Sequence, residues 1–325
     1  MKPSKTLPTL LLSCLVLSGC QSGKKAKEGS PLSPAQQESA LSKTTPPQQF
    51  SAFSIHPAGN GITYAGNTRL HPHHLASVDM LKDNIPVIKV RGKSKRNKMN
   101  VLLDFGSASS WLEFSASQKF AAQVMGIDGM VIPYRGKSNT GGQNAYAGVV
   151  TQLRIEGVFM EDVPFYIRMV SGSLGPLARG IQKPKVDAVL GYDNLRAFEY
   201  IQINLRKGTI SFSSDIPYIP HDELLMTTAK IIRLPGYGLT IEGAIRGKPV
   251  PVILDFAGDY SFERGDKKVN NTKQVSLGDV VFLNVPTLVL EPHNSPPRAG
   301  RRMLESYIIT ICGPEGVVYF ERPPE

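Results

Sequence analysis

The chain has 325 residues, a hydrophobic share of 41% and a formal net charge of +10 at pH 7. This length suffices for about two domains, and the apolar share excludes a chain that lacks a core. Only 8% of the residues are aromatic, whereas 25 prolines and 30 glycines favour a β-rich fold with many turns.

The first twenty residues have the pattern of an export signal. Lys2 and Lys5 precede an apolar run over 7–17, which is too short to span a bilayer as a stable helix. The following Leu-Ser-Gly-Cys resembles the bacterial lipobox, in which the thiol is lipidated and the cysteine becomes the mature N-terminus. The alternative is an ordinary signal peptide with a chance cysteine. We expect residues 1–19 to be removed and Cys20 to anchor the chain in the bacterial cell envelope.

The residue after Cys20 refines the expected location and partners. Gln21 resembles an outer-membrane address, so in a host with two membranes we expect the periplasmic face of the outer membrane. Cleavage leaves 35 basic against 27 acidic residues, a net charge of +8, which favours anionic envelope surfaces. Nucleic acid is not expected as a partner outside the cytoplasm.

After removal of the signal and lipidation of Cys20, Cys312 is the single free thiol. This excludes an internal disulfide and is typical of a small core residue.

Residues 20–80 are polar and rich in Pro, Ser, Gln and Lys. Such a composition buries too little apolar surface to offset the entropy of ordering, so it predicts a flexible tether. His71, His73 and His74 lie at its end without a nearby cluster of Cys or carboxylates. This pattern favours a solvated linker over a metal site, and no metal is expected.

From residue 85 onward, short apolar strands alternate with turns. The predicted elements are strands at 88–90 and 100–103 around a basic turn at 92–97, a helical stretch near 114–125, strands at 147–155 and 163–169, and a closing segment over 186–212 with a turn at Gly208.

The chain then repeats this arrangement. Leu-Asp-Phe at 103–105 returns at 254–256, each time after a Gly-Lys turn, and the pattern of 157–164 returns at 279–286 with the same spacing. The final hairpin of 200–212 is echoed by 307–320. We infer two lobes derived from one unit, over 85–214 and 231–325.

The segment 101–107, Val-Leu-Leu-Asp-Phe-Gly-Ser, resembles the catalytic-aspartate segment of pepsin-like and retropepsin-like aspartic proteases. The stretch 187–195, followed by a hairpin at 207–210, is similar to the second signature of that family. The resemblance covers nearly all of the first copy and, more weakly, the second. It implies an all-β, bilobal fold with a complete first lobe and a truncated, divergent second lobe.

The resemblance implies an aspartic endopeptidase that hydrolyses peptides or proteins with Asp104, Asp255 and an activated water, without a cofactor. Two facing carboxylates cannot both ionise easily, so one can accept a proton from water while the other donates to the scissile carbonyl. Gly106 would let the backbone approach this dyad, and Ser107 could support Asp104 by a hydrogen bond. Taken singly, an aspartate at a strand end is more often a turn-capping carboxylate, and it is the repeated pair that favours a dyad.

A flap is expected over residues 134–146, because Gly141 and Gly142 allow bending there. Tyr134 or Tyr146 would reach the substrate from this flap. An ordinary surface hairpin explains the two tyrosines equally well.

The sequence departs from the family at both aspartates. Phe105 and Phe256 replace the hydroxyl residues that follow the catalytic acids, and the symmetry of the change predicts that the two rings pack against each other. Ala257 and Gly258 depart further in the second copy. Two alternatives therefore stay open: an inactive protease fold that binds peptides or envelope polymers, and a homodimer that uses Asp104 from each chain.

Overall fold

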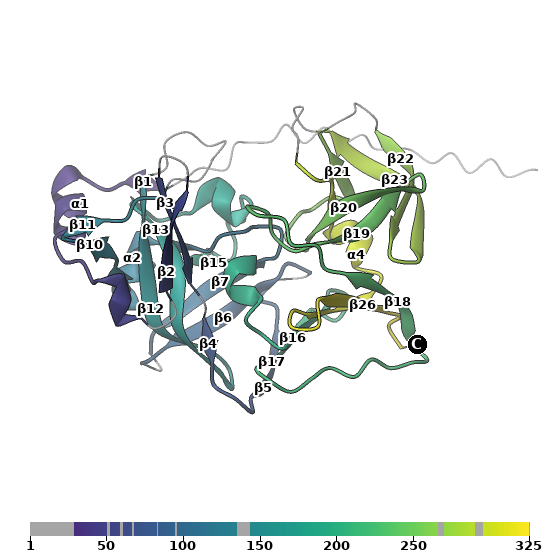
Figure 1. The fold of residues 1–325 in the computed structure, drawn as a ribbon, viewed down its shortest axis with the longest axis horizontal. Helices are drawn as coiled ribbons and strands as arrows, with labels where there is room; N and C mark the ends of the chain where they lie inside the picture. The colour runs from purple at the N-terminus through teal and green to yellow at the C-terminus, as the bar shows by residue number, and fades with distance from the viewer. Residues whose placement is uncertain are drawn as a thin grey trace, which may run out of the picture.

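A computed structural model describes residues 29–50, 53–58, 61–66, 68–82, 84–94, 96–134, 144–265, 270–289 and 295–324. The chain is mostly β-strand and forms two barrels and a shared sheet (Figure 1). The expected signal peptide and Cys20 lie outside the described residues.

The first lobe is a closed six-stranded barrel. Its strands follow the order β6-β7-β15-β8-β13-β12, and the pairing of β12 with β13 closes the ring. The bounds are β6 (Val87–Gly92), β7 (Lys98–Asp104), β8 (Trp111–Glu113), β12 (Ala145–Ile155), β13 (Val158–Arg168) and β15 (Ala188–Gly191). Short additions are β4 (Arg69–Leu70), β9 (Gln123–Val124), β10 (Gly126–Ile127), β11 (Met130–Val131), α2 (Phe114–Lys119), η2 (Gly175–Ala178) and α3 (Tyr192–Leu195).

The second lobe is a closed barrel with the same connectivity. Its order is β19-β20-β24-β21-β23-β22, with β19 (Thr240–Ile245), β20 (Lys248–Asp255), β21 (Phe262–Arg264), β22 (Asn271–Leu277), β23 (Val280–Val289) and β24 (Arg298–Gly300). In both barrels the first hairpin is followed by two parallel pairings, β7 with β15 and β8 with β13 in one lobe, β20 with β24 and β21 with β23 in the other. The predicted bilobal all-β fold is confirmed, and the matching order supports a duplication.

The second lobe was expected to be truncated and divergent, yet it has counterparts to both the strand β15 and the short helix α3 of the first lobe. The structure supplies both, as β24 and the following α4 (Arg301–Leu304). Arginines at 298, 301 and 302 hide the pattern, because a strand that faces a polar cleft need not be apolar throughout.

A six-stranded sheet joins the two lobes (Figure 1). Its order is β18-β26-β25-β16-β17-β5, with β5 (Leu75–Asp79), β16 (Tyr200–Asn204), β17 (Thr209–Ser213), β18 (Leu225–Lys230), β25 (Ile308–Cys312) and β26 (Val317–Glu321). The two echoed hairpins pair with each other through β16 and β25, so each lobe contributes equally to the junction. Cys312 is buried there as a free thiol, and burial raises its pKa to about 12.

Alternating patterns along these strands build the cores. In β17 and β26 every second residue is apolar and buried, which places Ile210, Phe212, Val318 and Phe320 on one face of the joining sheet. These side chains share one continuous core with both barrels. The lobes therefore pack as one unit, which fixes the site between them.

The expectation of a flexible tether over 20–80 is wrong for the described part of that segment. β1 (Ser30–Pro31) pairs with β14 (Val170–Ser171), and α1 (Pro34–Leu41) and η1 (Pro47–Gln49) follow on the first lobe. Leu32 and Phe50 are buried there, and β2 (Phe53–Ala58) pairs with β3 (Gly61–Gly66). A few apolar side chains and open strand edges suffice to order a polar segment once a barrel is present.

The histidines at the end of this segment are also attached to the lobes. His71 lies 2.9 Å from the Glu161 carboxylate, and His73 lies 3.2 Å from that of Asp215. Both side chains therefore contact carboxylates of the folded chain and do not belong to a free linker. The predicted helix near 114–125 is shorter than expected, since α2 ends at Lys119 and β9 follows.

Candidate functional site

Asp104 and Asp255 end equivalent strands of the two barrels. Asp104 closes β7 beside Gly191 of β15, and Asp255 closes β20 beside Gly300 of β24. Their relative exposures are 3% and 0%. Two acidic residues at the facing strand ends of two lobes are what the repeat predicted, and buried carboxyl groups require compensating partners.

The residues that follow the two aspartates pack together, as predicted. The rings of Phe105 and Phe256 are fully buried, with centroids 5.3 Å apart and an interplanar angle of 70°. This edge-to-face contact is a favoured aromatic geometry. Two apolar rings therefore hold the two aspartate loops together.

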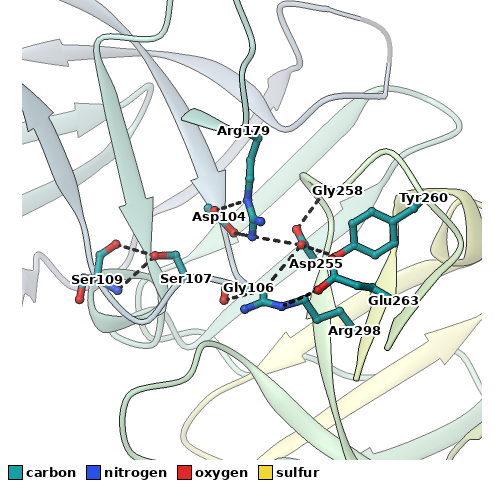
Figure 2. A network of polar contacts seen from close by, with 10 residues as sticks. All are labelled: Asp104, Gly106, Ser107, Ser109, Arg179, Asp255, Gly258, Tyr260, Glu263 and Arg298. Atoms are coloured by element: carbon teal, nitrogen blue, oxygen red, sulfur yellow. Dashed lines mark hydrogen bonds and ion pairs between the residues drawn. The ribbon is translucent and has the colours of Figure 1, made fainter. Parts of the chain in front are cut away.

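A guanidinium lies between the two carboxyl groups (Figure 2). Arg179 donates from Nε to Asp104 Oδ2 at 2.9 Å and from Nη2 to Asp104 Oδ1 at 3.2 Å. The same Nη2 lies 3.0 Å from Asp255 Oδ2. Burial opposes the charge of Arg179, but Asp104 and Asp255 outweigh that penalty and hold its pKa well above its ordinary value. The arginine is thus a permanent cation shared by the pair.

The position of Arg179 is set by the first lobe. It follows η2 in the left-handed conformation, with φ of 53°, and its N–H donates to the carbonyl of Pro176. Leu174 and Ala178 beside it are buried in a small core cluster that also contains Ala257 of the second lobe. Ala257 of the second lobe therefore packs against the segment that carries the arginine.

Asp255 has three further partners on the second lobe. The Tyr260 hydroxyl donates to its Oδ2 at 2.6 Å, and the Gly258 N–H donates to its Oδ1 at 3.0 Å. Arg298 Nη1 lies 3.7 Å from Oδ2. Burial, followed by the charge of Asp255, raises the pKa of Tyr260, so it stays a neutral donor. Gly258 has no side chain to support Asp255, and the Tyr260 hydroxyl two residues later provides this hydrogen bond.

Arg298 connects the two aspartate loops. Its Nη1 donates to the carbonyl of Gly106 at 3.1 Å, and its Nε lies 3.8 Å from Glu263 Oε1. A Cβ on Gly106 would lie 2.9 Å from Arg298 Nη1 and 3.1 Å from Asp255 Cγ. The predicted close approach of the Gly106 backbone is confirmed, and only glycine fits without displacement.

The predicted hydrogen bond from Ser107 to Asp104 is not formed. The Ser107 hydroxyl donates to the carbonyl of Ser109 at 2.9 Å (Figure 2). A hydroxyl has one proton, so this bond leaves none for Asp104. Arg179 takes that supporting role, because it satisfies both oxygens of Asp104.

A cavity of about 240 Å³ opens beside the aspartate pair. Gly106, Ser107, Trp111, Tyr134, Tyr237 and Arg298 contribute to its lining. The Tyr134 ring packs edge-on against Trp111, with centroids 4.7 Å apart, and burial raises its pKa. Tyr134 is the predicted flap tyrosine that reaches the cleft.

The other residues predicted for the flap are not among those that line the cavity beside the aspartates. Tyr146 lies within β12, paired with Ile167 of β13, and does not line the cavity. Gly141 and Gly142 lie outside the described residues. The flap prediction is therefore narrowed to Tyr134 in the part of the chain that the structure describes.

The arrangement favours charge pairing over proton transfer. A carboxyl dyad that activates water needs a water-sized space between the acids and one mobile proton. Here the space is filled by a guanidinium that cannot act as an acid near neutral pH.

Within the described ranges, no group of three or more His, Cys, Asp or Glu side chains could hold a metal ion. In the same ranges, no helix is both long and apolar enough to cross a membrane.

Sequence reasoning missed Arg179, Tyr260 and Arg298. Arg179 is 75 residues from Asp104, and no local spacing links the two. A signal did exist at Arg298, which stands in the second copy where the first has the buried Val189. A charged residue within a repeated apolar strand indicates a partner of opposite charge.

Comparison with known proteins adds no identity to this geometry. No protein-family model matches the sequence, and no curated protein matches it significantly. What the chain shows is a mostly β fold of two closed six-stranded barrels, compatible with a double-barrel fold, with an arginine-bridged pair of aspartates between them.

Proposed function

We propose that this protein binds peptides in the cleft between its lobes without hydrolysing them, as a lipoprotein anchored through Cys20 in the bacterial envelope. One observation carries the proposal: the Arg179 guanidinium contacts both Asp104 and Asp255. It stands where the attacking water of an aspartic endopeptidase would lie. The cluster is thereby a rigid structural element at the base of the cleft.

The lining of the cleft suits an extended polypeptide. Trp111, Tyr134 and Tyr237 offer aromatic surface, and Arg298 adds a cation at the base. Aromatic side chains with a few polar groups are typical of peptide-binding grooves, because they bury apolar side chains while pairing the backbone. A protein that keeps this fold but pairs both aspartates with an arginine would still bind peptides in the cleft and would no longer hydrolyse them.

The test is to measure binding and cleavage of one fluorescent peptide library by the same preparation. We expect micromolar binding to a subset of peptides and no cleavage between about pH 4 and pH 8. Substituting Tyr237, which lines the cleft and is partly exposed, by Ala should weaken binding at least tenfold. Measurable hydrolysis by the wild-type protein would contradict the proposal, and so would the absence of binding across the library.

An endopeptidase is the second candidate, favoured by the equivalent positions of Asp104 and Asp255 at the ends of β7 and β20. In this case Arg179 is a removable block, and the acids meet a water once it leaves. Arg179→Met should then create cleavage at mildly acidic pH, and either Asp104→Asn or Asp255→Asn should abolish it.

The same variants test the homodimer hypothesis. If Asp255→Asn keeps the turnover that Asp104→Asn removes, two Asp104 residues from different chains form the dyad. The contacts of Asp104 within one chain, through Arg179 to Asp255, instead favour a complete intramolecular pair.

A further inference from the structure

A second and larger cavity lies at the junction of the lobes, next to the cleft. Its volume is about 510 Å³. The first lobe contributes Tyr166, Tyr192 and Arg196 to its lining, and the segment that leads into the second lobe contributes Arg233 and Tyr237. It shares Ser109, Tyr237 and two neighbouring residues with the lining of the cleft cavity. A chain that leaves the cleft in this direction therefore enters the junction cavity.

The junction cavity presents two cations without acidic partners. Arg196 and Arg233 are both exposed, and neither has an ion pair within 4.0 Å among the described residues. In contrast, Arg179, Arg298 and Arg302 all contact carboxylates. Two unpaired guanidiniums at one concave site attract an anion.

Both guanidiniums act on the same point of the cavity wall. Burial raises the pKa of Tyr192 to about 12, and the charges of Arg196 and Arg233 oppose that rise. The two arginines thus come from different segments but line the same cavity as Tyr192, and the charge of each acts on the Tyr192 hydroxyl. Asp193 is the acidic residue in the described lining, and its oxygens accept hydrogen bonds from Ser110 and Asn194. The charge of Arg196 partly offsets the rise that burial causes in the pKa of Asp193, but no ion pair within 4.0 Å joins Asp193 to either arginine among the described residues.

The segments that carry the two arginines are fixed to the loop after Asp104. The N–H of Leu239 donates to the carbonyl of Phe105 at 2.7 Å, and a Cβ on Gly238 would lie 2.1 Å from that oxygen. On the other side, the N–H of Tyr192 donates to the carbonyl of Ser107 at 2.9 Å. The backbone of both segments is consequently anchored near the cleft, and an anchored backbone limits the positions that the two arginine side chains can reach.

We propose that the junction cavity is an acidic subsite of the peptide cleft, in which Arg196 and Arg233 bind a carboxylate of the bound peptide. The inference rests on the proposed function and specifies its ligand as an acidic peptide. Guanidinium–carboxylate hydrogen bonds are charge-assisted, and the planar fork favours a carboxylate over an amide of the same shape. The carboxylate can belong to an Asp or Glu side chain or to the peptide C-terminus.

The experiment compares matched peptides by fluorescence anisotropy on the full mature chain. The peptides share one apolar sequence and carry either Glu or Gln at each position, with a free or an amidated C-terminus. We expect at least one Glu peptide to bind about tenfold more tightly than its Gln counterpart, and this preference to shrink as salt rises. A preference for the free over the amidated terminus would identify the C-terminal carboxylate as the source.

Charge-removing variants locate the preference. The double variant Arg196→Gln with Arg233→Gln should abolish the Glu preference while changing the affinity for the Gln peptide less than twofold. The matched control is Arg206→Gln with Arg246→Gln, which removes two exposed arginines outside the lining of the junction cavity and should keep the preference. All four positions are exposed, and equal melting temperatures verify that each variant folds.

The outcomes separate this inference from the proposed function. The acidic subsite is overturned, with peptide binding intact, if the wild-type protein binds Glu and Gln peptides equally and also binds free and amidated termini equally. An equal loss of the preference in the control variant overturns it as well. If the wild-type protein binds none of the peptides, the proposed function fails and the subsite with it. Cleavage of bound peptides with the Glu preference retained refutes only the non-hydrolytic role.

Discussion

Asp104 and Asp255 end equivalent strands in two barrels of the same connectivity, yet their surroundings differ. Asp104 relies on Arg179 for the hydrogen bonds to both of its oxygens. Asp255 shares that arginine and has a tyrosine hydroxyl, a backbone N–H and a second arginine besides. The second lobe, which is shorter, surrounds its aspartate more completely.

This difference shows that equivalent acids in two similar lobes can have different neighbours. An arginine from the first lobe, and Tyr260 and Arg298 from the second, fill the space around the two aspartates. A pair of carboxyl groups that would otherwise need protons becomes a paired structural cluster. Four sets of substitutions test how the surroundings of the two aspartates differ.

Among these substitutions, we expect the largest loss of stability from removing one ring of the Phe105–Phe256 pair. The loss should be similar for either ring. Phe256→Ala removes a fully buried ring and should lower the free energy of unfolding by about 4 kcal/mol, with Phe105→Ala giving a similar loss. Urea unfolding of both variants and of the double variant measures the loss and the coupling. Phe256→Leu, a milder change, is the control. A large difference between the two alanine variants would show that the lobes do not share this contact equally.

Removing the Arg179 guanidinium that bridges the two aspartates should cause the second-largest loss of stability. Arg179→Met leaves Asp104 and Asp255 buried without their shared partner and should lower the free energy of unfolding by about 3 kcal/mol. Adding Asp104→Asn to this variant should recover part of the loss. Arg302→Met, which breaks an exposed ion pair, is the control and should cost less than about 1 kcal/mol. An unchanged stability of Arg179→Met would mean that the bridge between the two aspartates does not stabilise the fold.

The hydroxyl of Tyr260 distinguishes the second aspartate from the first. Tyr260→Phe removes the donor that lies 2.6 Å from Asp255 Oδ2 and should lower the free energy of unfolding by about 2 kcal/mol. Tyr319→Phe, whose hydroxyl bonds Glu315 at the surface, should change it by about 0.5 kcal/mol or less. If both variants lose equally little, Arg179 alone compensates Asp255, and the two surroundings are energetically alike.

The smallest effect is a difference in pH dependence between the lobes. Burial raises the pKa of Asp193 from 3.8 to about 6. The folded protein therefore holds this proton more tightly than the unfolded chain. Its contribution to stability is complete below about pH 4 and is lost as the pH rises through about 6. Relative to Asp193→Asn, the wild-type free energy of unfolding should fall between those two pH values.

The corresponding helix of the second lobe should give the opposite sign. Arg302 of α4, by its hydrogen bond, lowers the pKa of Asp259 below 3.8. That contribution is present above about pH 4 and is lost as the pH falls further. Relative to Asp259→Asn, the wild-type stability should therefore decrease toward low pH. Equal slopes for the two substitutions would contradict the assignment.

Much of the fold followed from the sequence. The repeated Leu-Asp-Phe segments, with apolar strands before them and glycine turns around them, predicted two lobes with Asp104 and Asp255 at matching strand ends. The packing of Phe105 on Phe256 also followed, because both copies changed in the same way. The segment before residue 81 was misjudged, since its order comes from the edges and grooves of a barrel formed by other residues.

The sequence alone therefore determined the strands, the duplication and the pairing of equivalent positions, because alternation and turn chemistry act over a few neighbouring residues. Only the tertiary structure decided what lies between the aspartates. Arg179 arrives from 75 residues away, and Arg298 reaches the carbonyl of Gly106 across 192 residues. Where such side chains meet depends on the folded path of all the chain between them, which no local pattern records.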